Sequence, residues 1–367
     1  MGGDWIERWA ETLVDYSVGV QRGDVVAITG GVAAEPLLRA VYRAVLTRGG
    51  HPVLLPTFPE AEADFLALGD DAQLDYLSPV DRFGAEQADA RIIVLADTNT
   101  HALSTVDPDR QQRRGRAETP LRTASMQRAA DGKLRWSLTL WPTPAYAQDA
   151  DMGTDAFAGF IRRACKLDQP DPAAAWRELS AEQARLIAWL TPRREVRLVA
   201  PDTDLRLGIG GRTWINSDGK RNFPSGEVFT GPVEDSVEGH VRFTFPVVTD
   251  GREVHDIRLR FEAGRVVDAS AAKGEEFLVR TLDTDAGSRR LGEFAFGTNF
   301  GITQFTKNIL LDEKIGGTVH MAVGAGYPDS GSTNRSAVHW DMICDLRQGG
   351  SVTVDGDLFV QDGRFVV

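Results

Sequence analysis

The sequence predicts two domains of different class. Residues 1–194 are expected to form an α/β domain with a mostly parallel sheet, and residues 195–367 an α+β domain with antiparallel strands. Before the boundary, short apolar strands alternate with helical segments, which is typical of a parallel sheet. After it, short strands follow one another across turns that contain glycine, which is typical of hairpins. A chain of 367 residues is long enough for two hydrophobic cores.

The first half begins with a strand–helix–strand unit. Apolar residues at helical spacing from Trp5 predict an amphipathic opening helix. Residues 25–29 form a short apolar strand, Gly30-Gly31 follows it, residues 34–48 form a helix, and residues 52–55 form the next strand. The two glycines are not part of a nucleotide-binding motif of either common type, so we assign them to the turn between strand and helix.

The rest of the first half continues this alternation. Residues 101–133 are polar and rich in arginine, which predicts a solvated helix or one that packs against another subunit. His51 and His101 stand alone and are interpreted as structural or surface residues. Further strands are expected at residues 91–97 and 134–141, and helices at 154–167 and 171–190.

The second half changes class near residue 195. Thr-Asp-Gly and Ala-Gly turns separate its apolar segments, which indicates antiparallel hairpins. The expected strands are residues 196–199, 205–209, 241–248, 254–261 and 265–268.

Composition excludes several classes of partner and location. The 41 Lys and Arg residues against 53 Asp and Glu residues give a net charge of -12, which argues against nucleic acid or an anionic membrane as partner. Cys165 and Cys344 lie far apart and predict buried thiols in a reducing compartment. The first residues do not resemble a signal peptide, and apolar runs are too short to span a bilayer. We therefore expect a cytoplasmic protein.

A pair of potential metal ligands lies in residues 336–342 (SAVHWDM). In an extended segment, alternation places His339 and Asp341 on one face and the apolar residues on the other. One imidazole and one carboxylate on the same face make half of a metal site. A strand with two polar residues on a solvated face explains the same pattern.

Three further residues stand in apolar or glycine-flanked surroundings. Glu227 lies in GEVFTGP, Glu293 in LGEFAFGTN and His320 in DEKIGGTVHMAVGAGYP. Taken singly, they are also explained as a turn residue, an ion-paired surface group and a core histidine. Together with His339 and Asp341 they supply two Glu, two His and one Asp, the ligand complement of a two-metal hydrolase.

These four segments, in this order, resemble the M29 family of metallo-aminopeptidases, the thermophilic aminopeptidase or aminopeptidase T family. The opening VDYSVGVQRGDVVAITGG and the helix that ends in RGGHPV resemble the start of the same family. The loop between His320 and His339 is short for the family, which affects the expected substrate cavity. The resemblance implies a homodimer, with residues 1–194 as dimerisation domain, that acts on short peptides. It also implies an active-site tyrosine at Tyr327 and metal ligands at Glu227, Glu293, His320, His339 and Asp341.

The expected reaction is removal of N-terminal residues by water activated at two divalent cations, with Zn, Co, Mn and Mg all compatible with the ligands. Glu293 is expected to bridge the ions, Glu227 to shuttle a proton, and Tyr327 to donate to the oxyanion. Two His and one Asp also form the ligand set of a non-haem iron site, so a ring-cleaving dioxygenase related to the dihydroxypyridine dioxygenases is the alternative. A non-enzymatic, metal-stabilised binding protein is the third.

Overall fold

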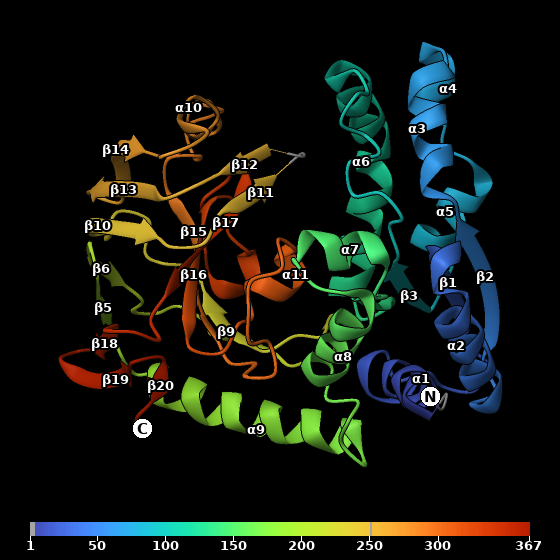
Figure 1. Cartoon of the computed structure of the whole chain (residues 1–367), viewed down its shortest axis with the longest axis horizontal. Coiled ribbons are helices and arrows are strands. Elements are labelled where there is room, and N and C mark those ends of the chain that lie inside the picture. Colours follow the sequence, from blue (N-terminus) through green and yellow to red (C-terminus); the bar gives the residue numbers. More distant parts are fainter. Residues whose placement is uncertain (1–3, 250–251) are drawn as a thin grey trace. The chain divides into compact units, whose positions relative to one another are not determined.

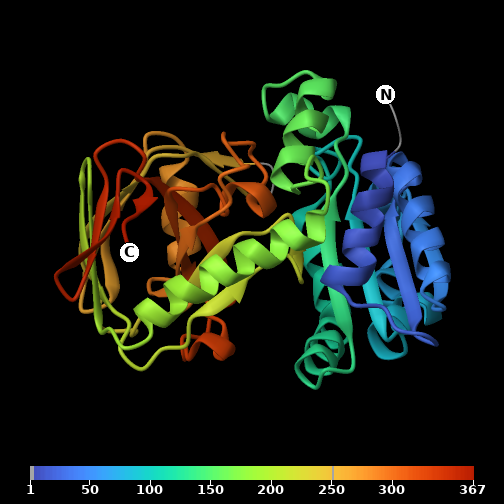
Figure 2. The same ribbon diagram turned by 90° about the horizontal axis from the view of Figure 1, so that it is seen from below.

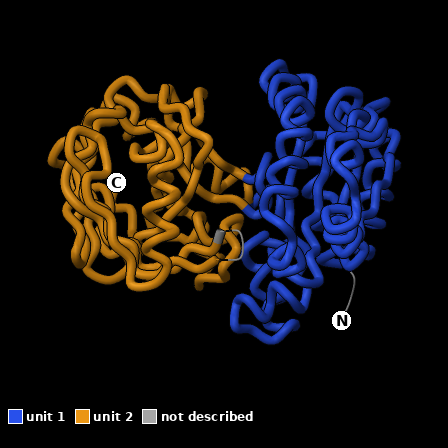
Figure 3. Tube along the Cα trace, turned by 90° about the horizontal axis from the view of Figure 1, so that it is seen from above, with its two compact units in different colours: residues 1–175, 219–224 blue, residues 176–218, 225–367 orange. Residues whose placement is uncertain are grey.

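The computed structural model describes residues 4–249 and 252–367 and contains two compact units, coloured separately in Figure 3. Unit 1 comprises residues 1–175 and 219–224, and unit 2 comprises residues 176–218 and 225–367. The change from one unit to the other falls inside helix α9 (Pro172–Leu190). The division into functional domains at residue 194 stays a prediction.

Unit 1 is built on a five-stranded parallel sheet with the order β2-β1-β3-β4-β8. Figure 2 shows helices on both sides of it, as the α/β prediction requires. The elements of the unit are α1 (Asp4–Glu11), the π-helix η1 (Thr12–Ser17), β1 (Val25–Gly31), the 3-10 helix η2 (Val32–Ala34), α2 (Glu35–Thr47), β2 (His51–Thr57), α3 (Pro59–Leu68), α4 (Asp71–Asp75), α5 (Pro79–Glu86), β3 (Ala90–Leu95), α6 (Pro108–Ala130), β4 (Arg135–Leu140), α7 (Pro144–Asp149), α8 (Thr154–Ala164) and β8 (Asn222–Phe223).

The first glycine of the Gly30-Gly31 pair allows two strands to approach each other. A Cβ atom on Gly30 would lie 2.8 Å from the carbonyl oxygen of Val94 in β3, closer than side chains tolerate. Both glycines belong to the end of β1, and the chain turns into η2 directly after them. The structure therefore explains Gly30 by strand packing as well as by the turn that follows.

The arginine-rich segment folds as α6, in which none of the residues is buried. Its arginines contact neighbouring helices of the same unit: Arg113 Nε lies 2.8 Å from Asp75 Oδ1, and Arg114 donates to the backbone carbonyl of Tyr76. The expected solvated helix is confirmed, and its expected contact with another subunit stays a prediction.

Unit 2 contains two large antiparallel sheets, labelled in Figure 1. One has eight strands in the order β14-β13-β10-β6-β5-β18-β19-β20, and the other has five in the order β17-β16-β15-β9-β7. The elements are β5 (Glu195–Ala200), β6 (Thr203–Gly208), β7 (Ile215–Ser217), β9 (Glu227–Thr230), β10 (Glu238–Phe243), β11 (Val247–Thr249), β12 (Arg252–Val254), β13 (Ile257–Glu262), β14 (Arg265–Ser270), α10 (Glu275–Leu282), β15 (Leu291–Gly297), α11 (Ile309–Asp312), β16 (Thr318–Gly324), the 3-10 helix η3 (Pro328–Ser330), β17 (His339–Asp345), β18 (Ser351–Val354), β19 (Asp357–Gln361) and β20 (Arg364–Phe365).

The core of unit 2 joins these two sheets. The five-stranded sheet contributes alternate residues to it, among them Phe294, Phe296, Met321 and Met342, and the eight-stranded sheet contributes residues such as Leu198. Because side chains alternate along a strand, the residues between these core positions point to the opposite face of the five-stranded sheet. That face is where the predicted ligands lie.

Two strands expected to be continuous are interrupted. Residues 241–248 divide into β10 and β11, because Pro246 lacks a backbone donor and Thr244 donates instead to the carbonyl of Ile343 in β17. Residues 254–261 divide into β12 and β13 at Asp256, whose φ of 52° is left-handed and ends the extended conformation. The predictions of single strands were wrong at these two points.

Both cysteines are buried and neither is in a disulfide, as expected. Across residues 4–249 and 252–367, the helices are too short or too polar to cross a bilayer.

Candidate metal centre

Four neighbouring strands of the five-stranded sheet position the five predicted ligands. Glu227 is the first residue of β9, Glu293 lies in β15 and His320 in β16, and His339 and Asp341 lie in β17. Since β17, β16, β15 and β9 are consecutive in the sheet, residues separated by up to 114 positions along the chain become neighbours. Of the segment 336–342 considered as extended, β17 contains residues 339–342, which include both expected ligands, and residues 336–338 precede the strand.

Small side chains lie between the ligands across the strands. Ala322 pairs with Glu293 on one side and with Asp341 on the other. Ala295 pairs with His320 in the next register position. A methyl group fills little of the space above the sheet, so the longer carboxylate and imidazole groups can approach one another there, with their ligand atoms within 4.8 Å in each set.

Glu293 stands between two groups of ligands. Its Oε1 atom lies 3.2 Å from Nε2 of His320, and its Oε2 atom lies 3.6 Å from Nε2 of His339. On the first side, His320 Nε2 is also 3.3 Å from Glu227 Oε2. On the second side, His339 Nε2 is 3.5 Å from Asp341 Oδ2. The side chain of Glu293 is therefore shared by the sets Glu227–Glu293–His320 and Glu293–His339–Asp341.

The hydrogen bond of His339 directs a nitrogen toward the carboxylates. Its Nδ1 donates to the carbonyl of Ala325 at 2.7 Å. In the neutral ring, Nε2 then carries a lone pair and faces the acidic oxygens of Glu293 and Asp341. A lone pair and carboxylate oxygens repel one another unless a proton or a cation lies between them.

Separations within the cluster fit metal ligands. Ligands about 2.1 Å from one ion at a tetrahedral angle lie about 3.4 Å apart, and the four imidazole–carboxylate separations are 3.2–3.6 Å. In addition, the buried atoms Glu227 Oε2 and Asp341 Oδ1 have no hydrogen-bond partner among the described residues. Buried polar atoms without partners are costly, and cation binding would satisfy them.

The electrostatics of the cluster favour positive charge. Burial raises the pKa of Glu293, with the neighbouring Asp341 and Glu227 acting in the same direction. Burial by itself would lower the pKa of His320 and of His339, but the surrounding carboxylates raise both above the usual value. Without metal, the cluster therefore retains protons, and cations compete with these protons for the same atoms.

Two charged residues that the sequence analysis did not single out complete this region. Lys314 is fully buried; its Nζ contacts Glu313 Oε1 and lies 3.6 Å from Glu227 Oε1. Glu313 also forms a possible ligand group with His320 and Asp341. Burial lowers the pKa of Lys314. The available signal was the sequence ILLDEKIGG, in which charged residues interrupt an apolar run.

Tyr327, the active-site residue implied by the resemblance, lies beside this cluster. Its ring packs edge-on against the His339 imidazole at 5.2 Å between centroids. The centroid of its ring also lies 5.5 Å from that of Phe229. The side chain is half exposed, so it is accessible to a substrate.

Asp312, next to this region, is a buried carboxyl group with its own partners. Its Oδ1 accepts hydrogen bonds from the backbone nitrogen of Thr306 at 2.7 Å and from Thr306 Oγ1 at 2.8 Å. Burial raises the pKa of Asp312 to about 7, despite these hydrogen bonds. The folded protein therefore holds this proton over a pH range in which the unfolded chain has released it.

This proton predicts a pH dependence of stability. Because the folded pKa is raised, the contribution of Asp312 to the free energy of unfolding should fall as pH rises from about 4 to about 7. Asp312→Asn keeps an oxygen acceptor but does not titrate, so it should remove this fall, which is at most about 4 kcal/mol. Urea unfolding of both chelator-treated proteins across this range measures the difference. Parallel curves would contradict the prediction.

A comparison with known families decides which family this is. The family model described as "Thermophilic metalloprotease (M29)" matches residues 4–365. The chain belongs to the M29 metalloprotease family. The resemblance stated from the sequence motifs is thereby confirmed over almost the whole length.

Two named relatives and a solved structure are similar to this chain over almost its whole length. Aminopeptidase 2 of Geobacillus stearothermophilus is 30% identical, with 98% of this chain and 95% of the relative covered. Aminopeptidase T of Thermus thermophilus is 28% identical, again with 98% and 95% covered. The structure of wild-type AmpT from Thermus thermophilus superimposes with a TM-score of 0.85 at 25% identity, covering 99% of both chains.

A more distant structure shares the fold. The 2,5-dihydroxypyridine dioxygenase from Pseudomonas putida KT2440 superimposes with a TM-score of 0.55 over 99% of this M29 chain and 97% of its own. Its sequence identity is 17%, so the likeness concerns the fold alone.

Proposed function

We propose that this chain removes amino-terminal residues from short peptides at a centre of two divalent cations. Membership of a metalloprotease family and the aminopeptidase names of its relatives support the more general statement, that it is a metal-dependent aminopeptidase. The proposed ligands are Glu227, Glu293, His320, His339 and Asp341.

The observation that carries the two-ion proposal is the position of Glu293. Its two oxygens face different histidines, and each histidine has a further carboxylate beside it. A single ion would use one side of this arrangement and leave the other with unpaired buried groups. The cluster contains four carboxylates and one ammonium group, that of Lys314. The carboxylates are those of Glu227, Glu293, Glu313 and Asp341. Two divalent ions would offset the excess negative charge.

Bound divalent cations would supply an acidic water, polarise the scissile carbonyl and hold the free α-amine of the substrate. The chain's own residues complete the chemistry. Glu227, which has one oxygen toward Lys314 and the other without a hydrogen-bond partner among the described residues, is proposed to carry the proton from water to the leaving amine. Tyr327 is proposed to donate its hydroxyl proton toward the developing oxyanion.

Metal reconstitution tests the proposal. Chelator-stripped protein should be inactive on aminoacyl-p-nitroanilides, and Zn²⁺, Co²⁺, Mn²⁺ or Mg²⁺, added one at a time, should restore hydrolysis with about two ions bound per chain. The matched control is the N-acetylated substrate, which should not be cleaved because it has no free amine.

Three outcomes would contradict the proposal. If none of these metals restores hydrolysis, the proposed peptidase reaction is wrong. One iron per chain with O₂ uptake on a dihydroxypyridine would instead support the dioxygenase alternative. Recovery with one ion per chain would keep the peptidase but reject the two-ion centre. This experiment does not test three further proposals: the homodimer, the dimerisation role of residues 1–194 and the cytoplasmic location.

A further inference from the structure

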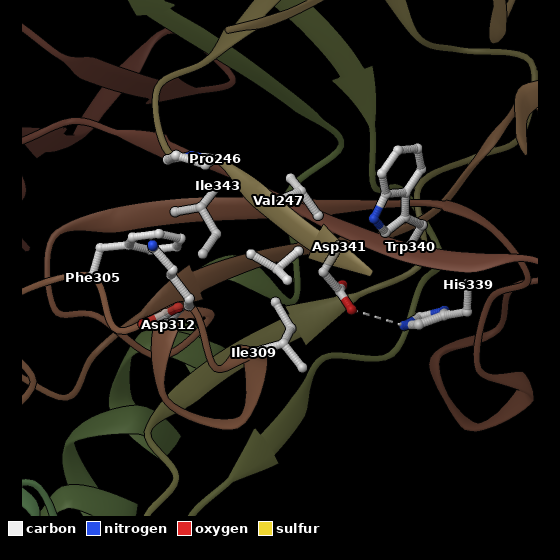
Figure 4. Close-up of a pocket in the computed structure, with 11 residues that line it drawn as sticks. Pro246, Val247, Phe305, Ile309, Asp312, His339, Trp340, Asp341 and Ile343 are labelled. Carbon is white, nitrogen blue, oxygen red and sulfur yellow. Dashed lines mark ion pairs between the residues drawn. The ribbon is translucent and has the colours of Figure 1, made fainter. Parts of the chain in front are cut away.

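A pocket opens beside the metal centre in unit 2. Its volume is about 120 Å³, somewhat less than the roughly 150 Å³ of an apolar cavity that accepts benzene, so it has room for a small side chain. Figure 4 shows side chains that line it. The lining residues are Pro246, Val247, Val248, Phe305, Lys307, Ile309, Asp312, His339, Trp340, Asp341 and Ile343.

One end of the pocket is part of the metal centre. His339 and Asp341 line it, and these two residues form the ion pair drawn in Figure 4. Beyond Asp341 lie Val247, Ile309 and Ile343, with Asp312 and Phe305 farther from His339 in the same view. The pocket therefore begins at the proposed ligands and continues between apolar side chains.

Two charged groups of the lining have partners of their own, whereas the indole nitrogen of Trp340 has no hydrogen-bond partner among the described residues. Asp312 accepts two hydrogen bonds from Thr306. The ammonium group of Lys307 lies 3.5 Å from Glu253 Oε1, which balances its charge outside the pocket. Away from His339 and Asp341, the pocket thus offers mainly aliphatic and aromatic contacts to an occupant.

We propose that this pocket binds the side chain of the substrate's first residue and selects aliphatic side chains of about the size of leucine. This inference rests on the proposed function, in which the α-amine is held at the metal centre. The side chain of the first residue begins one bond from the carbon that carries this amine, so it must enter space next to the ligands. The pocket that adjoins His339 and Asp341 is such a space, and its volume of about 120 Å³ suits a branched aliphatic side chain such as that of leucine.

Ile309 is the position that tests the pocket. It is the first residue of α11 and is 46% exposed, so it can be changed without opening the core. Ile309→Trp should fill the pocket and lower kcat/KM for leucine p-nitroanilide at least tenfold, while the alanine substrate changes less than threefold. Ile309→Ala should enlarge the pocket and raise kcat/KM for the phenylalanine substrate severalfold relative to leucine.

A binding measurement separates recognition from turnover. Isothermal titration of the metal-loaded protein with L-leucinol should show at least tenfold weaker binding to the Ile309→Trp variant, with L-alaninol nearly unaffected. The matched control is Val267→Trp, which adds the same side chain at an exposed position of β14 outside the pocket. It should leave all substrates and both amino alcohols unchanged.

The outcomes distinguish this inference from the proposed function. If the native chain cleaves aminoacyl-p-nitroanilides but both Ile309 variants change all substrates in parallel, the pocket assignment is overturned and the peptidase remains. If arginine or lysine substrates respond most to Ile309, the aliphatic preference is overturned. If the native chain cleaves none of them with any metal, the proposed function fails first.

Discussion

Glu293→Gln is expected to lower kcat by about a thousandfold and to reduce the bound metal below two ions per chain. The native carboxylate directs one oxygen at each histidine, His320 and His339. Glutamine has the same length but replaces one oxygen with an NH₂ group, which has no lone pair available for a cation. The group shared by the two proposed ion sites is thereby lost.

Kinetics and metal analysis measure this effect together. The matched control is Glu276→Gln, which removes a carboxylate from an exposed side chain on α10 and should leave activity and metal content unchanged. Urea unfolding of the chelated proteins checks that the Glu293 variant still folds. A folded variant with native kcat and two ions per chain would refute the bridging role.

Lys314→Met is expected to destabilise the metal-free protein by about 3–5 kcal/mol. The lysine is fully buried between Glu313 and Glu227, and methionine fills similar volume without charge. The carboxylates would then remain buried without their cation. Bound metal should reduce the loss, because it supplies positive charge to Glu227 in place of the ammonium group.

Urea unfolding with and without metal measures both parts of this prediction. Lys273→Met is the matched control, since Lys273 pairs with Glu253 at an exposed site and should cost no more than about 1 kcal/mol. Equal small losses in the two variants would show that the buried pair contributes no more than the surface pair. If bound metal does not reduce the loss of stability in Lys314→Met, then Lys314 does not interact with the proposed metal ligands.

The sequence predicted the chemical types at the centre better than their arrangement. His339 and Asp341 were assigned to one face because alternation in a strand is local, and β17 has that conformation. Glu293 stood out because a carboxylate among Leu291, Phe294 and Phe296 is costly to bury alone. Lys314 was missed, since its burial depends on what the chain packs above the sheet.

Local patterns also limited the strand predictions. Residues 241–248 have the apolar pattern of one strand, yet Thr244 donates to Ile343 in another strand and Pro246 provides no donor. The left-handed backbone of Asp256 interrupts the next segment in the same way. The acceptor for Thr244 lies in a strand far along the chain, and the break at Asp256 is a property of its backbone conformation, so hydrophobic periodicity revealed neither.

The sequence by itself determined the class of each half, most of the apolar strands and a set of residue types suited to a metal site, because periodicity and side-chain chemistry are properties of short segments. Only the tertiary structure decided that Glu293 lies between His320 and His339, that Lys314 faces Glu227, and that an apolar pocket begins at Asp341. Strand order and register set these relations, since they bring side chains from four separate segments to one face of a sheet.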